Sequence, residues 1–280
     1  MMQTVKGAYR LQVYEGSELV TDTYEFDNLI TDTALTLGDP FSSGFLCVGA
    51  GNRQPETTDT ALENELANTA GSFTSSAVIF MQGANRYAKR SVTATFTGLS
   101  GNIAEVGFRG SGANSVRSRS LVRDGNGLAT IIPIAPSQTL KISYFVYVLI
   151  PDVLATGTVT TPYGSSVFTI KPHDELTDPA GILAGRFNNP FAGAGLRASL
   201  SNGTTIDAAV FSWAYDAETQ TATATVNFVA TETNRTVTGF RAATSDENAK
   251  NLPIIELANP IVNPANNDIG FTLSFSWGRL

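Results

Sequence analysis

Residues 118–135 read SRSLVRDGNGLATIIPIA, and this stretch decides the fold. Two short apolar runs flank the tetrapeptide Asp124-Gly125-Asn126-Gly127. Asp, Asn and Gly tolerate the backbone conformations that a tight reversal requires, and such a turn between two β-type runs is typical of a hairpin. The stretch therefore predicts two antiparallel strands joined by a short turn.

The same alternation of short strands and turns extends outward in both directions. From about residue 73 the chain consists of brief runs rich in Val, Ile, Thr, Phe and Tyr, separated by turn signals such as 83–85, 98–102 and 135–137. After a connector at 151–165 a second series of such runs follows. Strands spaced by roughly 8–12 residues with these turns predict a sandwich or a barrel.

The N-terminal part adds short helices to a hairpin. Residues 8–26 alternate around Gly16 and predict a hairpin, whereas 29–37 predict a short helix stopped by Gly38-Asp39-Pro40. The pentapeptide TDTAL occurs at 31–35 and again at 58–62. In the second copy Thr60 and Glu63 have the spacing of a capping box, which predicts another short helix there.

These patterns together predict an all-β protein with two β-sandwich-like lobes behind a small N-terminal hairpin and short-helix region. The expected boundaries are 1–70 for the N-terminal docking region, 71–155 for the first sandwich and 156–280 for the second. The two strand series can also be aligned, since NIAEVGFRG at 102–110 matches NRTVTGFRA at 234–242. An internal duplication is one interpretation, and chance recurrence of strand-rich sequence is the other.

Composition excludes some classes of function. The net charge of −7 disfavours a nucleic-acid binder, because neutralising phosphates requires clustered Lys and Arg. Charge is segregated along the chain, with three bases against eleven acids in 1–65, eight against two in 66–150 and seven against twelve in 151–280. Opposite charges on successive segments favour docking between copies of the chain, or else they form an uneven solvated surface.

Single residues exclude further classes. The only cysteine, Cys47, excludes an internal disulfide and a zinc site built from cysteines, and the apolar run around it predicts a buried, inert thiol. No apolar run approaches the ~20 residues of a membrane span, and the N-terminus lacks the apolar core of a signal peptide. We therefore expect no membrane insertion and synthesis in the cytoplasm.

No motif predicts an active site or a cofactor. GAGNRQ at 49–54 has Gln54 where a dinucleotide fingerprint needs its third glycine, and it lacks the Lys of a phosphate-binding P-loop. His173 is the only histidine, and its sequence neighbours Asp174 and Glu175 are poorly placed for a catalytic triad. We therefore predict no catalytic, cofactor-binding or metal-binding residues.

The densest local charge lies between residues 109 and 123. Arg117, Arg119 and Arg123 share parity, so that a strand would carry them on one face, and Arg109 lies nearby. Such a group predicts a contact with an acidic neighbour, such as residues 1–65 of another copy, or with an anionic cell-surface polymer. A solvated hairpin tip is the alternative interpretation.

Acids beside aromatic residues form the other candidate site. Asp207, Asp216 and Glu218 lie at turn-like positions, and a pair of distant carboxylates is the requirement for glycoside cleavage. Trp213 and Tyr215 flank two of these acids and are candidate glycan contacts. The alternative is a strand, a turn capped by Asp216, and a second strand.

Several segments resemble structural proteins of tailed bacteriophages, which occur among tail, baseplate and fibre components. The similar segments are FDNLITDTAL (26–35), CVGAGNRQPETTDTAL (47–62), GNIAEVGFR (101–109), SRSLVRDGNG (118–127) and IIPIAPSQTLKISYFVY (131–147). The resemblance covers about residues 1–150 and supplies no catalytic residues. It implies a homo-oligomer built into a virion, with copies of itself, other virion proteins and a host surface glycan or receptor as partners.

The resulting hypothesis is a non-enzymatic tail or baseplate protein that attaches fibres or contacts the host. A capsid-decorating or head-fibre protein and a carbohydrate-cleaving tail enzyme are the alternatives, and a cellular adhesin is a more distant one.

Overall fold

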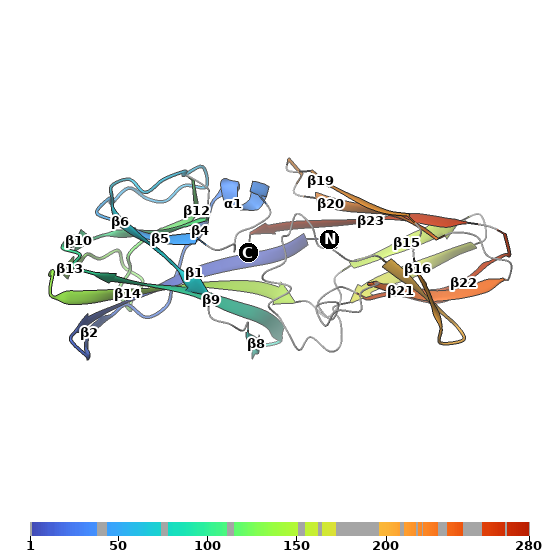
Figure 1. Ribbon diagram of the computed structural model, residues 1–280, viewed down its shortest axis with the longest axis horizontal. Coiled ribbons are helices and arrows are strands. Elements are labelled where there is room, and N and C mark those ends of the chain that lie inside the picture. The colour runs from blue at the N-terminus through green and yellow to red at the C-terminus, as the bar shows by residue number, and fades with distance from the viewer. Residues whose placement is uncertain are drawn as a thin grey trace. The chain divides into compact units, whose positions relative to one another are not determined.

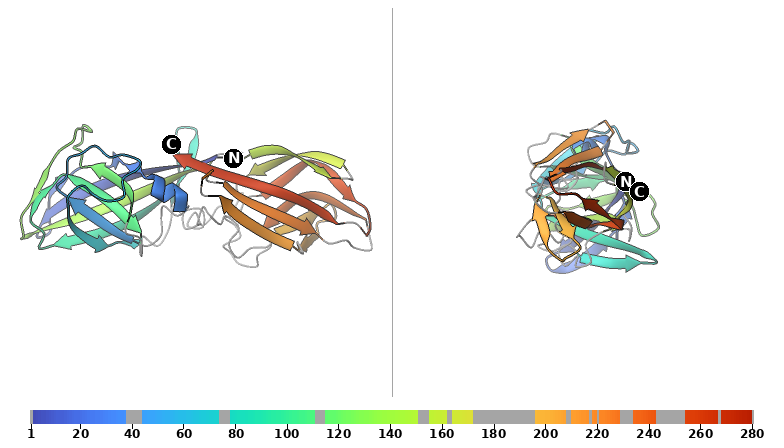
Figure 2. Two further views of the ribbon diagram at one scale, coloured as in Figure 1. Left: turned by 90° about the horizontal axis from the view of Figure 1, so that it is seen from above. Right: turned by 90° about the vertical axis from the view of Figure 1, so that its right-hand side faces the viewer.

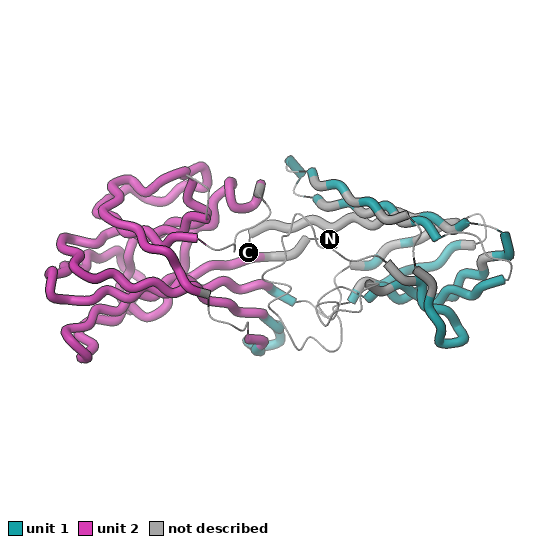
Figure 3. The backbone as a smooth tube through the Cα atoms, in the orientation of Figure 1, with its two compact units in different colours: residues 1–3, 80–87, 149–278 teal, residues 4–79, 88–148, 279–280 magenta. Residues whose placement is uncertain are grey.

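The computed structural model describes residues 2–37, 44–73, 78–110, 115–150, 155–161, 164–171, 196–207, 210–216, 218–219, 221–228, 234–242, 254–266 and 268–279. The chain divides into two compact units (Figure 3). Unit 2 comprises residues 4–79, 88–148 and 279–280, and unit 1 comprises residues 1–3, 80–87 and 149–278.

Most of the first fourteen strands belong to unit 2, together with helix α1 (Asp32–Leu37). These strands are β1 (Met2–Glu15), β2 (Glu18–Asp22), β3 (Phe26–Asp27), β4 (Leu29–Ile30), β5 (Gly44–Gly49), β6 (Glu65–Ala70), β7 (Ser72–Phe73), β8 (Val78–Gln82), β9 (Asn85–Thr97), β10 (Gly101–Ile103), β11 (Glu105–Gly110), β12 (Val116–Leu121), β13 (Ile132–Ile134) and β14 (Gln138–Ile150).

Two antiparallel layers build unit 2. In one layer β1 pairs with β14, which is followed by β9 and β7, while β2 and β3 pair with β1. The other layer has the order β4-β12-β11-β5-β6. Figure 1 shows β5, β6 and β12 on one side of this unit and β1, β9 and β14 on the other. The short pair β10–β13 lies outside both sheets.

An aromatic contact joins the two layers of unit 2. Tyr9 of β1 stacks on Tyr144 of β14 with ring centroids 4.9 Å apart, and Phe108 of β11 stacks on Tyr144 at 5.1 Å. All three side chains are buried. The Tyr9 hydroxyl forms a hydrogen bond of 2.5 Å with Oγ of Ser118 in β12. Alternate residues of β14 are buried, as a strand with one face on a core requires.

Unit 1 contains the remaining strands (Figure 1, Figure 2). They are β15 (Ala155–Thr161), β16 (Gly164–Lys171), β17 (Leu196–Leu200), β18 (Thr205–Asp207), β19 (Val210–Asp216), β20 (Thr221–Phe228), β21 (Arg235–Ala242), β22 (Ile254–Asn263) and β23 (Ile269–Arg279). One sheet has the order β15-β16-β22-β21-β17-β18, and the other contains β19-β20-β23. Phe228 of β20 stacks on Phe240 of β21 at 5.6 Å and joins the two sheets.

The structure confirms the predicted all-β class with sandwich-like lobes, but it corrects the N-terminal region. The predicted boundary at residue 70 is wrong, because β5 pairs with β11 along its length and β1 pairs with β14. Residues 1–70 therefore supply strands to both layers of the first lobe and do not form a separate docking region. The hairpin β1–β2 and the turn at Asp124–Gly127 are confirmed. The predicted pairing of the strands on either side of that turn is wrong, because β12 pairs with β11 and β4, β13 pairs with β10, and among the described residues only the isolated bridge Arg123–Ala129 joins the two segments.

The two TDTAL segments have different structures. The first forms α1, where Thr31 Oγ1 accepts a hydrogen bond of 3.4 Å from the Ala34 N–H. The helix predicted from the second copy is wrong, since residues 57–64 form turns and bends. Glu63, the expected capping-box acid, instead accepts hydrogen bonds from the N–H groups of Asn52 and Arg53. A tertiary contact has overridden a local capping signal.

The aligned segments of the two strand series occupy similar places in the two units. Gly-Phe-Arg occurs in β11 and again in β21. In each case the Phe, Phe108 or Phe240, is buried and stacks on an aromatic ring of the opposite sheet. In sequence β9 matches β20, and β14 matches β23. In the structure β9 is the neighbour of β14, and likewise β20 is the neighbour of β23.

Replacing Phe108 by Ala tests the contact between the layers. We expect Phe108→Ala to lower the free energy of unfolding by about 3–5 kcal/mol, because the ring is fully buried and its removal leaves a cavity. Urea unfolding, monitored by far-UV circular dichroism, measures the change. The control is Leu128→Ala, whose side chain is 65% exposed and should change stability by less than about 0.5 kcal/mol. Equal losses in both variants would contradict this account of the core.

Candidate functional site

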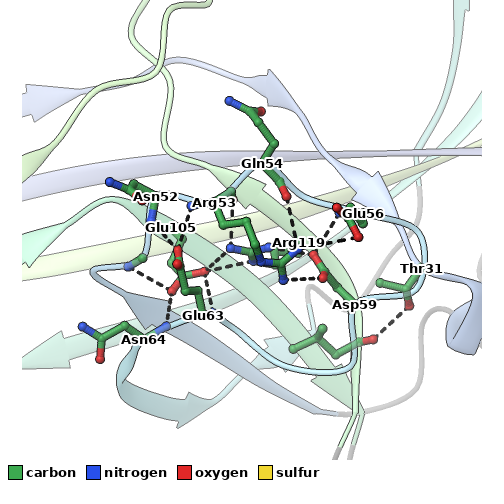
Figure 4. Close-up of polar contacts among 12 residues, drawn as sticks. Thr31, Asn52, Arg53, Gln54, Glu56, Asp59, Glu63, Asn64, Glu105 and Arg119 are labelled. Atoms are coloured by element: carbon green, nitrogen blue, oxygen red, sulfur yellow. Dashed lines mark hydrogen bonds and ion pairs between the residues drawn. The ribbon is translucent and has the colours of Figure 1, made fainter.

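The main polar cluster of unit 2 lies beneath residues 50–64, which we call the clasp loop (Figure 4). Its centre is Glu105 at the start of β11, a side chain with no exposed surface. Oε1 of Glu105 accepts hydrogen bonds from the N–H groups of Gly51 (3.0 Å) and Asn64 (2.7 Å). Oε2 accepts from the Glu63 N–H (3.0 Å) and from Nε of Arg119 (2.9 Å). One buried carboxylate thus holds both ends of the loop.

Arg119 supplies the opposite charge from the neighbouring strand β12 and is also fully buried. Besides its bond to Glu105, its Nη1 donates to Oδ2 of Asp59 (2.6 Å) and its Nη2 donates to the backbone oxygen of Arg53 (3.0 Å). The planar fork of the guanidinium suits such a divided set of acceptors, which an ammonium group does not match. Arg119 therefore ties the middle of the clasp loop to the sheet.

Asp59 and Glu63 complete the network from the loop itself. Burial raises the pKa of the Asp59 carboxyl, but hydrogen bonds from the Glu56 N–H and from the guanidinium groups of Arg53 and Arg119 outweigh burial, so the pKa lies below its usual value. Hydrogen bonds from the backbone N–H groups of Arg53 and Asn52 lower the pKa of Glu63. Carboxyls held as anions in this way are poor proton donors, so the cluster is not arranged for general acid catalysis.

Steric crowding explains why both Gly49 and Gly51 of GAGNRQ lack a side chain. A Cβ on Gly49 would lie 2.5 Å from Oε1 of Glu105, and a Cβ on Gly51 would overlap the same oxygen. The loop resembles a phosphate cradle because its backbone N–H groups do converge on anions. The anions are the chain's own carboxylates, Glu105 and Glu63.

The arginine group proposed as an external contact is corrected by burial. Arg119 is 0% and Arg117 is 6% exposed, because the face of β12 that carries both of them is covered. Nη1 of Arg109 lies 3.5 Å from Oε2 of Glu65. Nη1 of Arg123 donates a hydrogen bond of 2.8 Å to the backbone oxygen of Gly127. The four residues do not form one exposed basic surface.

The charge segregation along the chain is used within unit 2. Acids of residues 1–65 pair with bases of residues 66–150 in the same chain: Glu25 with Lys89 (2.6 Å), Asp59 with Arg119 (2.6 Å) and Glu65 with Arg109 (3.5 Å). The acidic neighbour expected from another copy is therefore, at these positions, the chain's own N-terminal part.

The second candidate site lies in unit 1 and is only partly described. Asp216 is exposed and accepts hydrogen bonds from the N–H groups of Glu218 (2.9 Å) and Thr219 (3.3 Å), so it caps the turn between β19 and β20. The pKa of the Asp216 carboxyl is lowered, mainly by the hydrogen bond from the Thr219 hydroxyl and then by these two backbone hydrogen bonds. Trp213 and Tyr215 belong to β19, but their side chains, like that of Asp207, lie outside the described residues.

The remaining single residues are placed as follows. Cys47 is buried in β5, and burial together with the charge of Glu65, against the opposing effect of Arg109, raises the pKa of its thiol to about 12. His173 lies outside the described residues. Among the residues that the structure describes, no group of three or more His, Cys, Asp or Glu side chains is arranged to hold a metal ion. No helix in the described part is long and apolar enough to cross a membrane.

Comparison with known protein families, with curated proteins and with solved structures found no match to this chain. The functional interpretation therefore depends on the sequence resemblance and on the geometry above. Sequence reasoning found the glycine loop and Arg119 but missed their common partner, Glu105. The available signal was a lone acid at the start of the apolar strand EVGFRG, in a segment otherwise rich in bases.

Removing Arg119 tests the clasp. We expect Arg119→Ala to lower the free energy of unfolding by about 3–5 kcal/mol, because Glu105 would remain buried without its counter-charge and Asp59 would keep only Arg53. Arg119→Lys should recover only part of this loss, since one ammonium group does not reproduce the three directions of the guanidinium. Chemical denaturation measures both.

Arg123→Ala is the matched control, because Arg123 lies in the same segment but donates to a turn carbonyl in a half-buried position. A change below about 1 kcal/mol is expected for it. A loss at Arg123 as large as that at Arg119 would show that the clasp has no special energetic role.

Acid should loosen the clasp before it affects the sheets. Because the folded pKa values of Asp59 and Glu63 are lowered, their contribution is fully present above the unfolded pKa values of about 4 and is lost as the pH falls through the folded values. Hydrogen exchange, corrected for the intrinsic rate, should show the Asn52 and Arg53 amides losing protection below about pH 4. Amides within β14 serve as the control, and equal protection of the loop at pH 2.5 and pH 6 would contradict the assignment.

Proposed function

We propose that this chain is a non-enzymatic structural protein of a tailed-bacteriophage virion, a tail or baseplate component that assembles as a homo-oligomer and attaches fibres or contacts the host. The localisation that follows from this proposal is the virion, after synthesis in the host cytoplasm.

The observation that carries the proposal is the convergence of the phage-like segments on one scaffold. CVGAGNRQPETTDTAL forms the end of β5 and most of the clasp loop, GNIAEVGFR supplies Glu105, and SRSLVRDGNG supplies Arg119. A resemblance to phage structural proteins that is carried by scaffold-building segments is compatible with a structural role and does not require a shared reaction.

Two edge strands of unit 2 support assembly with other chains. β2 pairs only with β1 among the described strands, and its consecutive residues Leu19 and Val20 are 45% and 43% exposed, so apolar side chains project from both of its faces. β6 lies at the edge of the second sheet and carries the exposed Leu66. Neither strand contains proline or lysine, the residues that commonly protect an edge from pairing.

The carbohydrate-cleaving alternative has less support. Asp216, one of its candidate acids, caps a turn and has a lowered pKa, which is opposite to the requirement for a general acid. The capsid-decorating alternative remains a competing proposal that the assembly experiment distinguishes.

The test combines light scattering, negative-stain electron microscopy and binding to isolated phage components. We expect a three- or six-fold particle that binds purified tails. Val20→Lys should weaken assembly, because a charge on the β2 edge opposes strand pairing. Leu128→Lys is the control, because Leu128 is an exposed apolar side chain (65%, against 43% for Val20) outside the edge strands.

Three outcomes would contradict the proposal. A strict monomer at all concentrations would exclude the homo-oligomer. Binding only to empty heads would favour the head-fibre alternative. Release of reducing sugar from host capsule would favour the tail enzyme.

A further inference from the structure

A groove in unit 2 lies next to the clasp loop and has not been assigned a role above. It lies between residues 23–29 and the turn 123–127, and Ser120 of β12 together with Gln54 and Pro55 of the clasp loop completes its lining. Its volume is about 580 Å³. Ligand sites for small molecules commonly span roughly 300–1,000 Å³. We call it the Tyr24 groove.

Tyr24 presents an aromatic ring at this groove. Its side chain is 65% exposed, although a ring of this size usually gains by burial. A Cβ on Gly125 would lie 3.5 Å from Cδ2 of Tyr24, so the ring is close to the hairpin turn on the opposite wall. The ring is therefore available to a ligand that enters the groove.

The backbone of Tyr24 is held in a costly conformation. Its φ is +58°, in the left-handed region that residues with a side chain rarely adopt. Oδ1 of Asp22 accepts the Tyr24 N–H at 2.9 Å, and the Thr23 hydroxyl donates to the Tyr24 oxygen at 3.0 Å. Asp22 is itself fixed by Nε of Arg10 at 2.9 Å and by Gln12 at 3.2 Å. Four side chains thus fix the position from which the ring projects.

The groove is also lined by hydrogen-bond donors and acceptors. Asp27 also pairs with Lys6 (2.9 Å), and Oδ1 of Asp124 accepts the N–H groups of Asn126 and Leu128, so these carboxylates offer their remaining lone pairs as acceptors. The Arg123 guanidinium offers donors, and the exposed Gln54 amide offers both donors and an acceptor. Arg123 uses Nη1 for the Gly127 oxygen, and a guanidinium carries five N–H groups. The lining therefore combines one aromatic face with planar hydrogen-bonding side chains.

We propose that the Tyr24 groove binds a neutral oligosaccharide. A sugar ring has a C–H face that packs on an aromatic ring, and its hydroxyls both donate to carboxylates and accept from guanidinium and amide groups. The lining carries three carboxylates, Glu25, Asp27 and Asp124, against the single guanidinium of Arg123, and Lys89 and Lys6 pair with Glu25 and Asp27. The groove therefore has no surplus of positive charge to attract a phosphate or polyanion. A purely apolar ligand would cover the Arg123 guanidinium and the Gln54 amide without offering them hydrogen bonds. The inference does not depend on the proposed virion role.

The clasp contributes directly to this site. The guanidinium of Arg119 binds the backbone oxygen of Arg53, the residue immediately before Gln54 and Pro55. The buried ion network thereby fixes the part of the loop that lines the groove, as a binding site requires of its supporting residues.

The experiment uses the purified full chain on a broad array of neutral, amino-sugar and acidic oligosaccharides, followed by calorimetric titration of each hit. We expect neutral oligosaccharides to bind. Tyr24→Gly should weaken binding at least about tenfold while leaving the thermal midpoint unchanged or higher, because glycine adopts a positive φ without strain. Tyr24→Phe, which keeps the ring, should retain most of the affinity.

Tyr14→Ala is the control, because this partly buried tyrosine of β1 lies outside the groove lining. Absence of any hit on the array, or binding that survives Tyr24→Gly, would overturn the inference. Binding confined to acidic sugars would also overturn it. A chain that assembles on tails but binds no glycan would refute this inference and leave the proposed function standing, whereas a glycan-binding monomer would do the reverse.

Discussion

The ion pair between Glu105 and Arg119 is the constraint on which the first lobe depends. Both side chains have no exposed surface, and removing two such charges from water costs several kcal/mol per ion unless each remaining acceptor and donor is satisfied. The clasp loop satisfies them with backbone N–H groups from both of its ends and with Asp59. The pair and the loop are therefore mutually dependent at both ends of the loop, while the middle of the loop is also held by the backbone hydrogen bonds of Thr57 with Asp32 and of Thr60 with Val116.

This dependence explains why a glycine loop resembles a nucleotide-binding motif without being one. Convergent N–H groups and glycines without Cβ atoms are needed wherever backbone approaches an anion closely, whether the anion is a phosphate or a carboxylate. Here Gly49 and Gly51 make room for the Glu105 carboxylate. The sequence excluded a nucleotide-binding loop, but it did not predict that the backbone N–H groups of this loop would bind carboxylates of the chain itself.

Local patterns predicted the strands, the turn at Asp124–Gly127 and the first short helix, because alternation and turn residues act over a few positions. They did not predict that the strands flanking this turn pair with other strands, β12 with β11 and β13 with β10. Local patterns failed where the conformation or burial of a residue depends on a partner that is distant in the sequence. Glu63 has a capping-box spacing, but it binds Asn52 and Arg53 across the loop. Likewise the parity of Arg117 and Arg119 correctly placed them on one face of β12, whereas the burial of that face depends on a loop more than 50 residues away in sequence. No pattern within either segment contains that information.

The comparison of the two units indicates what the buried pair is for. In the aligned segments NIAEVGFRG and NRTVTGFRA, Val237 occupies the position of Glu105 and is also buried, at 1% exposure. A valine is thus sufficient to complete such a strand, and apolar residues often replace buried ion pairs without loss of stability. Glu105 must then be explained by what a valine does not do, which is to accept the N–H groups of the clasp loop. The charge fixes the geometry of that loop, including Gln54 and Pro55 at the Tyr24 groove, and its desolvation cost is offset by the bonds that define this geometry.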